Sequence, residues 1–364
     1  MPELFSPLTL RSLEIPNRLW MSPMCMYSAD DADQRGRPTD FHLSHYASHA
    51  FGGAGLVMVE ATAVQERGRI SPWDLGLWES SQIPGFQRLV AGIRQGGAVP
   101  GVQLAHAGRK ASADWPGGTG AALSYEQGGW HTIGPSPVAF PGYPAPQEMT
   151  AQDISEFIED FVNAAQRARQ AGFDVVEIHA AHGYLLHSFL SPLSNRRSDD
   201  YGGDFTGRTR LLREVITAVR GVWPDHLPVM LRISTTDWVA EDPTRQEDSW
   251  TVEDSIELAR DAYELGVDLI DASSGGLVPA KISPETDYQT SKAARIRSEA
   301  QGHVAGVGRI SEATVAAELV SSGDVDAVFV ARQLLRDISW PNQVAVALGA
   351  SPRHIPQYGY AVGG

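Results

Sequence analysis

Residues 150–181 read TAQDISEFIEDFVNAAQRARQAGFDVVEIHAA, and this stretch contains an amphipathic helix followed by a buried strand. Apolar residues recur at three- and four-residue intervals in its first part, which is the period of a helix with one buried face. Thr150 and Asp153 form a variant capping box, and Gly172 suits the position after the helix end. The run Asp174–Ala181 is continuously apolar in character, as in strands buried on both faces. One helix and one strand in this order predict a unit of a parallel α/β sheet.

The same plan recurs along the chain. We predict a second capped helix at Thr251–Leu265 and a shorter one at Ser311–Ser321, which Ser311 could cap. Strand and helix alternate to the end, so the chain is predicted to be α/β, a single (β/α)8 TIM-barrel domain over residues 1–364. A doubly wound open sheet is the alternative, but the GxGxxG fingerprint that would favour it is absent. The eight expected strands are Leu19–Met24, Gly55–Thr62, Val99–His106, Asp174–Ala181, Pro228–Ser234, Asp268–Ser274, His303–Gly308 and Ala327–Arg332.

Two segments do not fit the repeat. Residues 114–147, after the third strand, are rich in Gly, Pro, Ser and Trp, and a loop of this length in a compact domain is usually a lid or binding loop. The tail at residues 351–364 carries two prolines and two tyrosines. Such a tail is either disordered or docked on a neighbouring subunit.

The composition excludes several classes of protein. With 29 Lys and Arg against 44 Asp and Glu, the net charge is −15, which disfavours binding to nucleic acid and to membrane surfaces. The single cysteine, Cys25, can form neither an internal disulfide nor a cysteine-rich metal cluster. No targeting signal is recognisable, and no apolar run approaches the roughly 20 residues that span a bilayer, so a cytoplasmic location is expected.

Two polar side chains inside the expected strands indicate an electron-rich ligand. Arg232 lies in the apolar run PVMLRIS, where an unpaired guanidinium is costly, so it must face an acceptor. The acceptor is either a barrel carboxylate, such as Glu60 or Glu177, or a partly anionic ligand. Gln103 can both donate to and accept from the edge of a heterocycle.

Small and cationic residues at the ends of the last strands suggest phosphate binding. They are Gly276, Gly308 and Arg332, and barrels often bind phosphate with the loops after strands 7 and 8. Glycines at strand ends are common in turns, so this signal alone is moderate.

His179, His182 and Tyr184 form the densest reactive cluster. The histidines could bind a metal, although no third ligand is apparent; they could be structural; or they could donate hydrogen bonds to one substrate oxygen. In the last case Tyr184, a weak acid, would protonate a carbanion or enolate. A glycosidase-like pair of Glu60 and Glu177 is a rival that leaves these residues without roles.

Several motifs together resemble the Old Yellow Enzyme family of flavin-dependent ene-reductases, above all its thermophilic-like subclass. They are SPMCMYS at residues 22–28, GVQLAHAGRKA at 101–111, HAAHGYL at 179–185 followed by SPLSN and DDYGG, and LIDASSGGLV at 269–278. The matching segments follow the family order along most of the chain, and the HAAHGYL set is highly specific.

The resemblance implies a site for FMN across the C-terminal mouth of the barrel. The cofactor residues it implies are Ser22, Pro23, Met24, Cys25, Ala61, Gln103, Arg232, Gly276, Gly308, Ala331 and Arg332. His179 and His182 would bind the activating oxygen of the substrate, Tyr184 would donate the proton, and Tyr27 would line the pocket. Cys25, counted among the catalytic residues, would tune the redox behaviour of the flavin.

The resemblance also implies an activity. NADPH, possibly NADH, would reduce FMN, which would pass a hydride to the β-carbon of enones, maleimides or nitroalkenes while Tyr184 protonates the α-carbon. No metal is expected. A homodimer or homotetramer is expected. Members of this subclass often carry a C-terminal arginine that enters the neighbour's active site, and this chain has Tyr360 at the aligned position, while Tyr358 matches a tail tyrosine. A flavin-binding carrier or sensor and a metal-dependent hydrolase or lyase that uses the two histidines are the alternatives.

Overall fold

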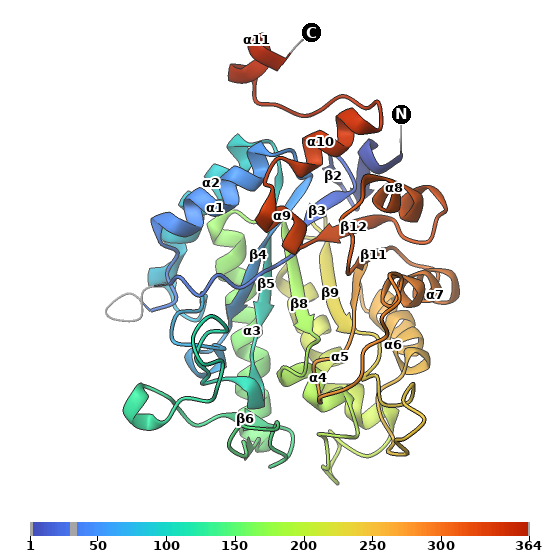
Figure 1. The fold of residues 1–364 in the computed structure, drawn as a ribbon. Coiled ribbons are helices and arrows are strands. Elements are labelled where there is room, and N and C mark those ends of the chain that lie inside the picture. Colours follow the sequence, from blue (N-terminus) through green and yellow to red (C-terminus); the bar gives the residue numbers. More distant parts are fainter. Residues whose placement is uncertain (1–2, 30–34, 363–364) are drawn as a thin grey trace.

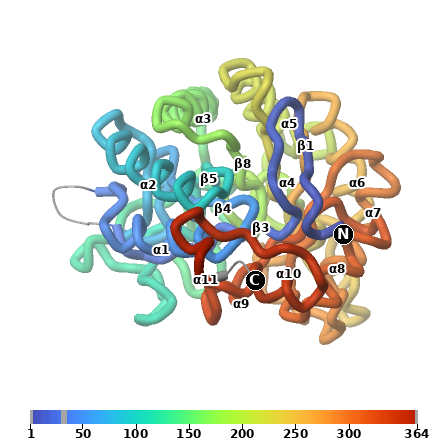
Figure 2. The backbone as a smooth tube through the Cα atoms, turned by 90° about the horizontal axis from the view of Figure 1, so that it is seen from above, coloured from blue at the N-terminus to red at the C-terminus, as the bar shows by residue number. Residues whose placement is uncertain are grey.

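A closed barrel of eight parallel strands forms the centre of the molecule, as the computed structural model of residues 3–29 and 35–362 shows (Figures 1 and 2). Its strand order is β10-β11-β12-β3-β4-β5-β8-β9. This closure confirms the predicted (β/α)8 barrel and excludes the open sheet. The barrel strands are β3 (Leu19–Met21), β4 (Leu56–Ala63), β5 (Val99–Ala105), β8 (Val175–Ala180), β9 (Val229–Ser234), β10 (Leu269–Ser273), β11 (Val304–Val307) and β12 (Ala327–Val330).

Each expected strand is present, and the first is shorter than expected. It ends at Met21 and not at Met24, because Pro23 has no N–H group to contribute to a ladder. Two further pairs of short strands lie outside the barrel. They are the antiparallel hairpin of β1 (Leu8–Leu10) and β2 (Leu13–Ile15) and the parallel pair of β6 (Ile133–Gly134) and β7 (Gln147–Glu148).

Helices surround the barrel and cover its outer face. The predicted capping of α3 is confirmed, since the Thr150 side chain accepts from the Asp153 backbone N–H and Gly172 adopts the left-handed conformation at φ 96°. The predicted cap at Ser311 is wrong: α8 begins at Ala313, one residue too far for Ser311 to be its N-cap. The helices are α1 (Asp40–Phe51), α2 (Ile83–Gln95), α3 (Ala151–Ala171), α4 (Leu185–Leu190), α5 (Phe205–Val222), α6 (Val252–Glu264), α7 (Thr290–Ala300), α8 (Ala313–Ser321), α9 (Arg332–Arg336), α10 (Trp340–Ala347) and α11 (Gly359–Val362).

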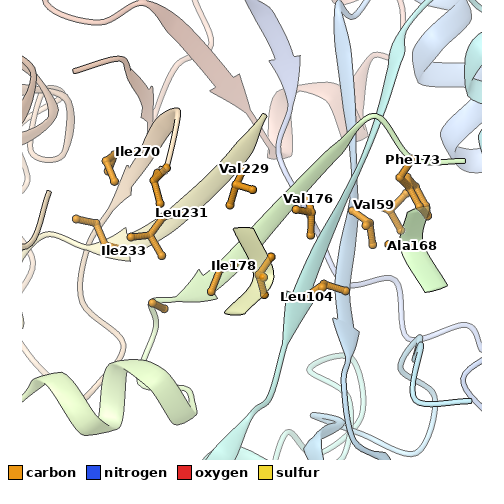
Figure 3. Close-up of a cluster of buried hydrophobic side chains, with 14 of the residues drawn as sticks. Val59, Leu104, Ala168, Phe173, Val176, Ile178, Val229, Leu231, Ile233 and Ile270 are labelled. Atoms are coloured by element: carbon orange, nitrogen blue, oxygen red, sulfur yellow. The ribbon is translucent and has the colours of Figure 1, made fainter. Parts of the chain in front are cut away.

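Two apolar clusters stabilise the barrel from opposite sides of its strands. The outer cluster packs strand residues such as Val176 and Leu231 against helix residues such as Ala168 (Figure 3). The inner cluster fills the N-terminal half of the barrel with Trp20, Phe329 and other apolar side chains. Leu8, Leu10 and Ile15 of the β1–β2 hairpin belong to this inner cluster, so the hairpin closes the N-terminal end of the barrel.

The expected loop and tail are both distinct from the repeat. Residues 114–147 contain a short 3-10 helix, Tyr125–Gln127, and the strand β6, and β7 begins at the last residue of this segment, so it is less irregular than its composition suggested. The tail leaves the barrel and ends in α11, where Tyr360 is 93% exposed (Figure 1). Residues 363–364 of the tail lie outside the described part. None of the described helices is long and apolar enough to cross a membrane.

Candidate active site

A layer of buried polar side chains lies directly above the inner apolar cluster. Residues two apart on a strand face the same side, so Glu177, Arg232 and Asp271 follow Val175, Met230 and Leu269 into the barrel interior. Gln103 joins them from β5, and all four side chains are almost fully buried. The interior thus changes from apolar to charged toward the C-terminal ends of the strands, where TIM barrels hold their active sites.

Arg232 is paired with a carboxylate that the sequence analysis did not name. Its Nε lies 3.1 Å from Oδ2 of Asp271, while Nη1 donates to Oγ of Ser22 at 3.3 Å. The expected salt bridge inside the barrel is confirmed, but its carboxylate is neither Glu60 nor Glu177, because Asp271 stands directly beside Arg232 in the strand register. Glu177 instead accepts a 2.8 Å hydrogen bond from Nε2 of Gln103.

The two histidine rings lie side by side and bring one nitrogen of each ring together. The Ala181 backbone N–H donates to Nδ1 of His179, so in the neutral ring Nε2 carries the proton. Ser273 Oγ lies 2.8 Å from Nε2 of His182, and a hydroxyl donating there leaves the proton on Nδ1. Nδ1 of His182 lies 3.4 Å from Nε2 of His179, within hydrogen-bond distance, and which of the two nitrogens donates depends on the tautomer of His182. Burial, and next the charge of Arg232, lower the pKa of both rings well below the usual value, so both are neutral.

Tyr184 lies beside this pair. Its ring centroid is 5.0 Å from that of His179, in an edge-to-face arrangement. Burial is the main cause that raises the pKa of the phenol well above its ordinary value, so Tyr184 is held protonated. Both His182, at φ 60°, and Tyr27, at φ 50°, occupy the left-handed region, and backbone strain of this kind concentrates at functional sites.

An irregularity in β4 shapes the opposite wall. The register to β5 shifts between Val59 and Thr62, which inserts one extra residue where Glu60 and the expected flavin residue Ala61 lie. Glu60 is bound by the Tyr46 hydroxyl and by the Met26 backbone N–H, so it anchors the segment of Ser22, Pro23, Met24 and Cys25. This role removes Glu60 from the proposed glycosidase pair.

Cys25 is held as a neutral thiol. Burial, followed by the charges of Asp74 and Glu60, raises the pKa of the thiol well above its ordinary value. A thiol is a far weaker nucleophile than a thiolate. The neutral state of the thiol therefore argues against a nucleophilic role for Cys25.

A cation-lined cavity of about 380 Å³ lies at the ends of β11 and β12. Gly308, Ala331 and Arg332, three of the expected phosphate residues, line it. A side chain at Gly308 would lie 2.6 Å from Nε2 of Gln289, so only glycine leaves this space open. Gly276 does not line the cavity; its carbonyl instead accepts a bond from Lys110.

Lys110 is the main residue that the sequence analysis missed. Its Nζ donates to the carbonyl oxygens of His182 at 2.9 Å and Gly276 at 3.0 Å, and it lies 5.4 Å from the Tyr184 ring centroid. Burial, and then the charge of Arg109, lower the pKa of Lys110 to about 8. Its position in the GVQLAHAGRKA motif, just past a strand end, was the available signal. The ring of Phe140, in the 114–147 loop, covers this ammonium group, with its centroid 4.6 Å from Nζ of Lys110.

The metal alternative lacks ligands. Within residues 3–29 and 35–362, no group of three or more His, Cys, Asp or Glu side chains is arranged to hold a metal ion. His179 and His182 contact each other and Ser273 instead.

Comparisons with known proteins identify the family of this chain. Residues 3–350 match the model of the NADH:flavin oxidoreductase / NADH oxidase family. The chain is 45% identical to an NADPH dehydrogenase of Geobacillus sp. (strain WCH70), covering 98% of this chain and 97% of that one. It is 43% identical to an NADPH dehydrogenase of Bacillus subtilis (strain 168), covering 92% of each.

A solved structure of morphinone reductase is similar in fold and sequence. It superimposes with a TM-score of 0.77 at 25% identity, covering 97% of this chain and 91% of that one. Morphinone reductase in complex with tetrahydroNAD gives a TM-score of 0.76 at 26% identity, covering 97% and 93%. The resemblance to the Old Yellow Enzyme family is thereby confirmed: this chain belongs to the NADH:flavin oxidoreductase / NADH oxidase family and is an FMN-dependent oxidoreductase.

Proposed function

We propose that this protein is an NADPH-dependent ene-reductase that reduces activated alkenes. The observation that carries the proposal is a pair of neutral imidazole nitrogens 3.4 Å apart, both of which carry hydrogen when the Ser273 hydroxyl donates to Nε2 of His182, beside a protonated tyrosine. Two converging donors suit a single carbonyl or nitro oxygen on which negative charge develops. The names of the relatives, NADPH dehydrogenase, favour NADPH as the electron donor.

The residues present fit FMN. Arg232 and Gln103 are polar groups held at the interior edge of the mouth, and the cavity with Gly308 and Arg332 offers space and positive charge for a phosphate. The flavin ring would be lined by Ser22, Pro23, Met24, Cys25 and Ala61. The backbone of Ala331 would bind the phosphate. Gly276 is better described as part of the wall under His182. When bound, FMN supplies hydride transfer from the nicotinamide to the alkene.

The side chains of the chain itself do the remaining work. Nε2 of His179 and Nδ1 of His182 would hold the activating oxygen and stabilise its developing charge without being protonated. The phenol of Tyr184 would then give its proton to the α-carbon, which is a stronger base than phenolate. Tyr27 would limit the pocket, and Phe140 with its loop would exclude water.

The test is turnover by the purified protein loaded with FMN. Oxidation of NADPH under anaerobic conditions should depend on 2-cyclohexenone and yield cyclohexanone. A protein that binds FMN and is reduced by NADPH, but transfers no hydride to any enone, maleimide or nitroalkene, would instead be the carrier or sensor. A protein that binds no FMN would contradict the proposal outright. A cytoplasmic location and a homodimer or homotetramer stay predictions.

A further inference from the structure

Gln103 and Arg232, the two side chains assigned to the flavin edge, each contact a buried carboxylate. Gln103 donates to Glu177 at 2.8 Å, and Arg232 lies 3.1 Å from Asp271. Glu177 and Asp271 are both fully buried. Oε2 of Glu177 and both carboxylate oxygens of Asp271 have no aligned hydrogen-bond donor in the described structure. The charge of Arg232 acts on both carboxyl groups, although only Asp271 lies at ion-pair distance from it.

The cost of this arrangement is large enough to need an explanation. A buried carboxylate without donors is destabilising, and well-packed apolar residues would usually be at least as stable. The layer directly below is apolar and contains Val175, Met230 and Leu269. The carboxylates therefore contribute something other than stability.

The charges acting on the pair can be named element by element. Strand β9 contributes Arg232, while β8 and β10 contribute the two carboxylates and, next to them, neutral His179 and Ser273. From β5 comes neutral Gln103, and β3 leads to the Ser22 hydroxyl. Strands β11 and β12 are apolar, and Glu60 of β4 is tied to Tyr46 and Met26. With a single cation for two carboxylates, both cannot be ionised at low cost.

Burial raises the pKa of both carboxyl groups, and the charge of Asp271 adds to the effect on Glu177. Asp271 has Arg232 at contact distance and so ionises first. Glu177 has only an amide donor and retains its proton to higher pH.

We propose that Glu177 and Asp271 are positioning residues that fix Gln103 and Arg232. Together they also set how strongly the site favours the reduced, anionic state of a bound flavin, because one of the two carboxyl groups retains its proton. This inference rests on the proposed function. The negative charge of Asp271 partly offsets the positive charge of Arg232. Ionisation of Glu177 adds a second negative charge next to Gln103, close to the same edge of the flavin. Both effects oppose reduction, so reduction should become harder as Glu177 loses its proton.

The test compares Glu177→Gln and Asp271→Asn with the wild type as FMN-loaded proteins. The readouts are the FMN dissociation constant and the reduction equilibrium of the bound flavin against a reference dye, between about pH 6 and pH 9. Asp326→Asn is the matched control, because it breaks another arginine–aspartate pair, 2.9 Å from Arg297, at the N-terminal side of β12.

Asp271→Asn should shift the reduction equilibrium at least about tenfold toward the reduced flavin, because Arg232 loses its counter-charge. Near neutral pH, the reduction equilibrium of the flavin in Glu177→Gln should match that of the wild type. At alkaline pH, the wild type should become harder to reduce as Glu177 ionises, and the variant should lack this additional change. The control should follow the wild type throughout. Unchanged pH profiles in both variants would overturn the inference, and Glu177→Gln alone decides if Asp271→Asn does not fold. Failure of the wild type to bind FMN would refute the proposed function instead.

Discussion

The two halves of the barrel interior differ sharply in polarity. The N-terminal half is apolar and closed by the β1–β2 hairpin, whereas the C-terminal half holds Glu177, Arg232 and Asp271 and opens at the mouth. The same strands build both halves, and only a shift of two residues along each strand separates Met230 from Arg232. One scaffold thus assigns stability to one end and chemistry to the other.

The largest effect is expected from opening the apolar half. Trp20 is fully buried in it and packs edge-to-face on Phe329 at 5.3 Å between ring centroids. Trp20→Ala should lower the free energy of unfolding by about 3–5 kcal/mol, as large-to-small core substitutions do. Denaturant unfolding measures this loss. Tyr184→Phe, in the polar half, is the control and should unfold like the wild type; equal losses in both variants would erase the distinction between the halves.

A pH-dependent effect is expected at Glu60. Burial raises the pKa of its carboxyl to about 8. In the unfolded chain this carboxyl group ionises near pH 4.3. Between about pH 4.3 and pH 8 the folded protein therefore retains a proton that the unfolded chain has lost. The free energy of unfolding then falls by up to about 1.4 kcal/mol for each unit by which the pH rises.

Glu60→Gln has no such proton and should become increasingly stable relative to the wild type as the pH rises from about 5 to 8. Urea unfolding at several pH values measures this difference. Parallel stability profiles of variant and wild type would show that Glu60 is not held neutral.

The smallest effect is expected at Ser273, whose Oγ lies 2.8 Å from Nε2 of His182 and would fix the proton of that ring on Nδ1 by donating to Nε2. Ser273→Ala removes one hydrogen bond of about 1 kcal/mol, which corresponds to about a fivefold slower reoxidation of the reduced protein by 2-cyclohexenone. Reduction by NADPH, measured by stopped flow, is the internal reference and should change little. A loss confined to the NADPH step would assign Ser273 to another role.

The sequence was sufficient for the architecture because apolar runs and caps are local signals. All eight barrel strands and the caps of α3 could be predicted from them. The hairpin that closes the barrel was missed, since its strands have only three residues each. The motif HAAHGYL at the end of a predicted strand also indicated that His179, His182 and Tyr184 form one cluster, and their rings are in contact.

The partners within the site could not be predicted in the same way. Whether Arg232 meets Glu60, Glu177 or Asp271 depends on which strands are adjacent and on their register, and neither is written locally in the chain. Lys110 was overlooked for a related reason, because its acceptors are backbone carbonyls of two distant loops.

The most direct test of the account is Tyr184→Phe in separate half-reactions, because the claim that this mouth protonates a carbon depends on that one hydroxyl. With FMN bound, reduction by NADPH should match the wild type, while reoxidation by 2-cyclohexenone should slow by about 100-fold or more, as loss of a general acid does. Wild-type reoxidation, or an equal loss in both half-reactions, would contradict the assignment of Tyr184 as the proton donor.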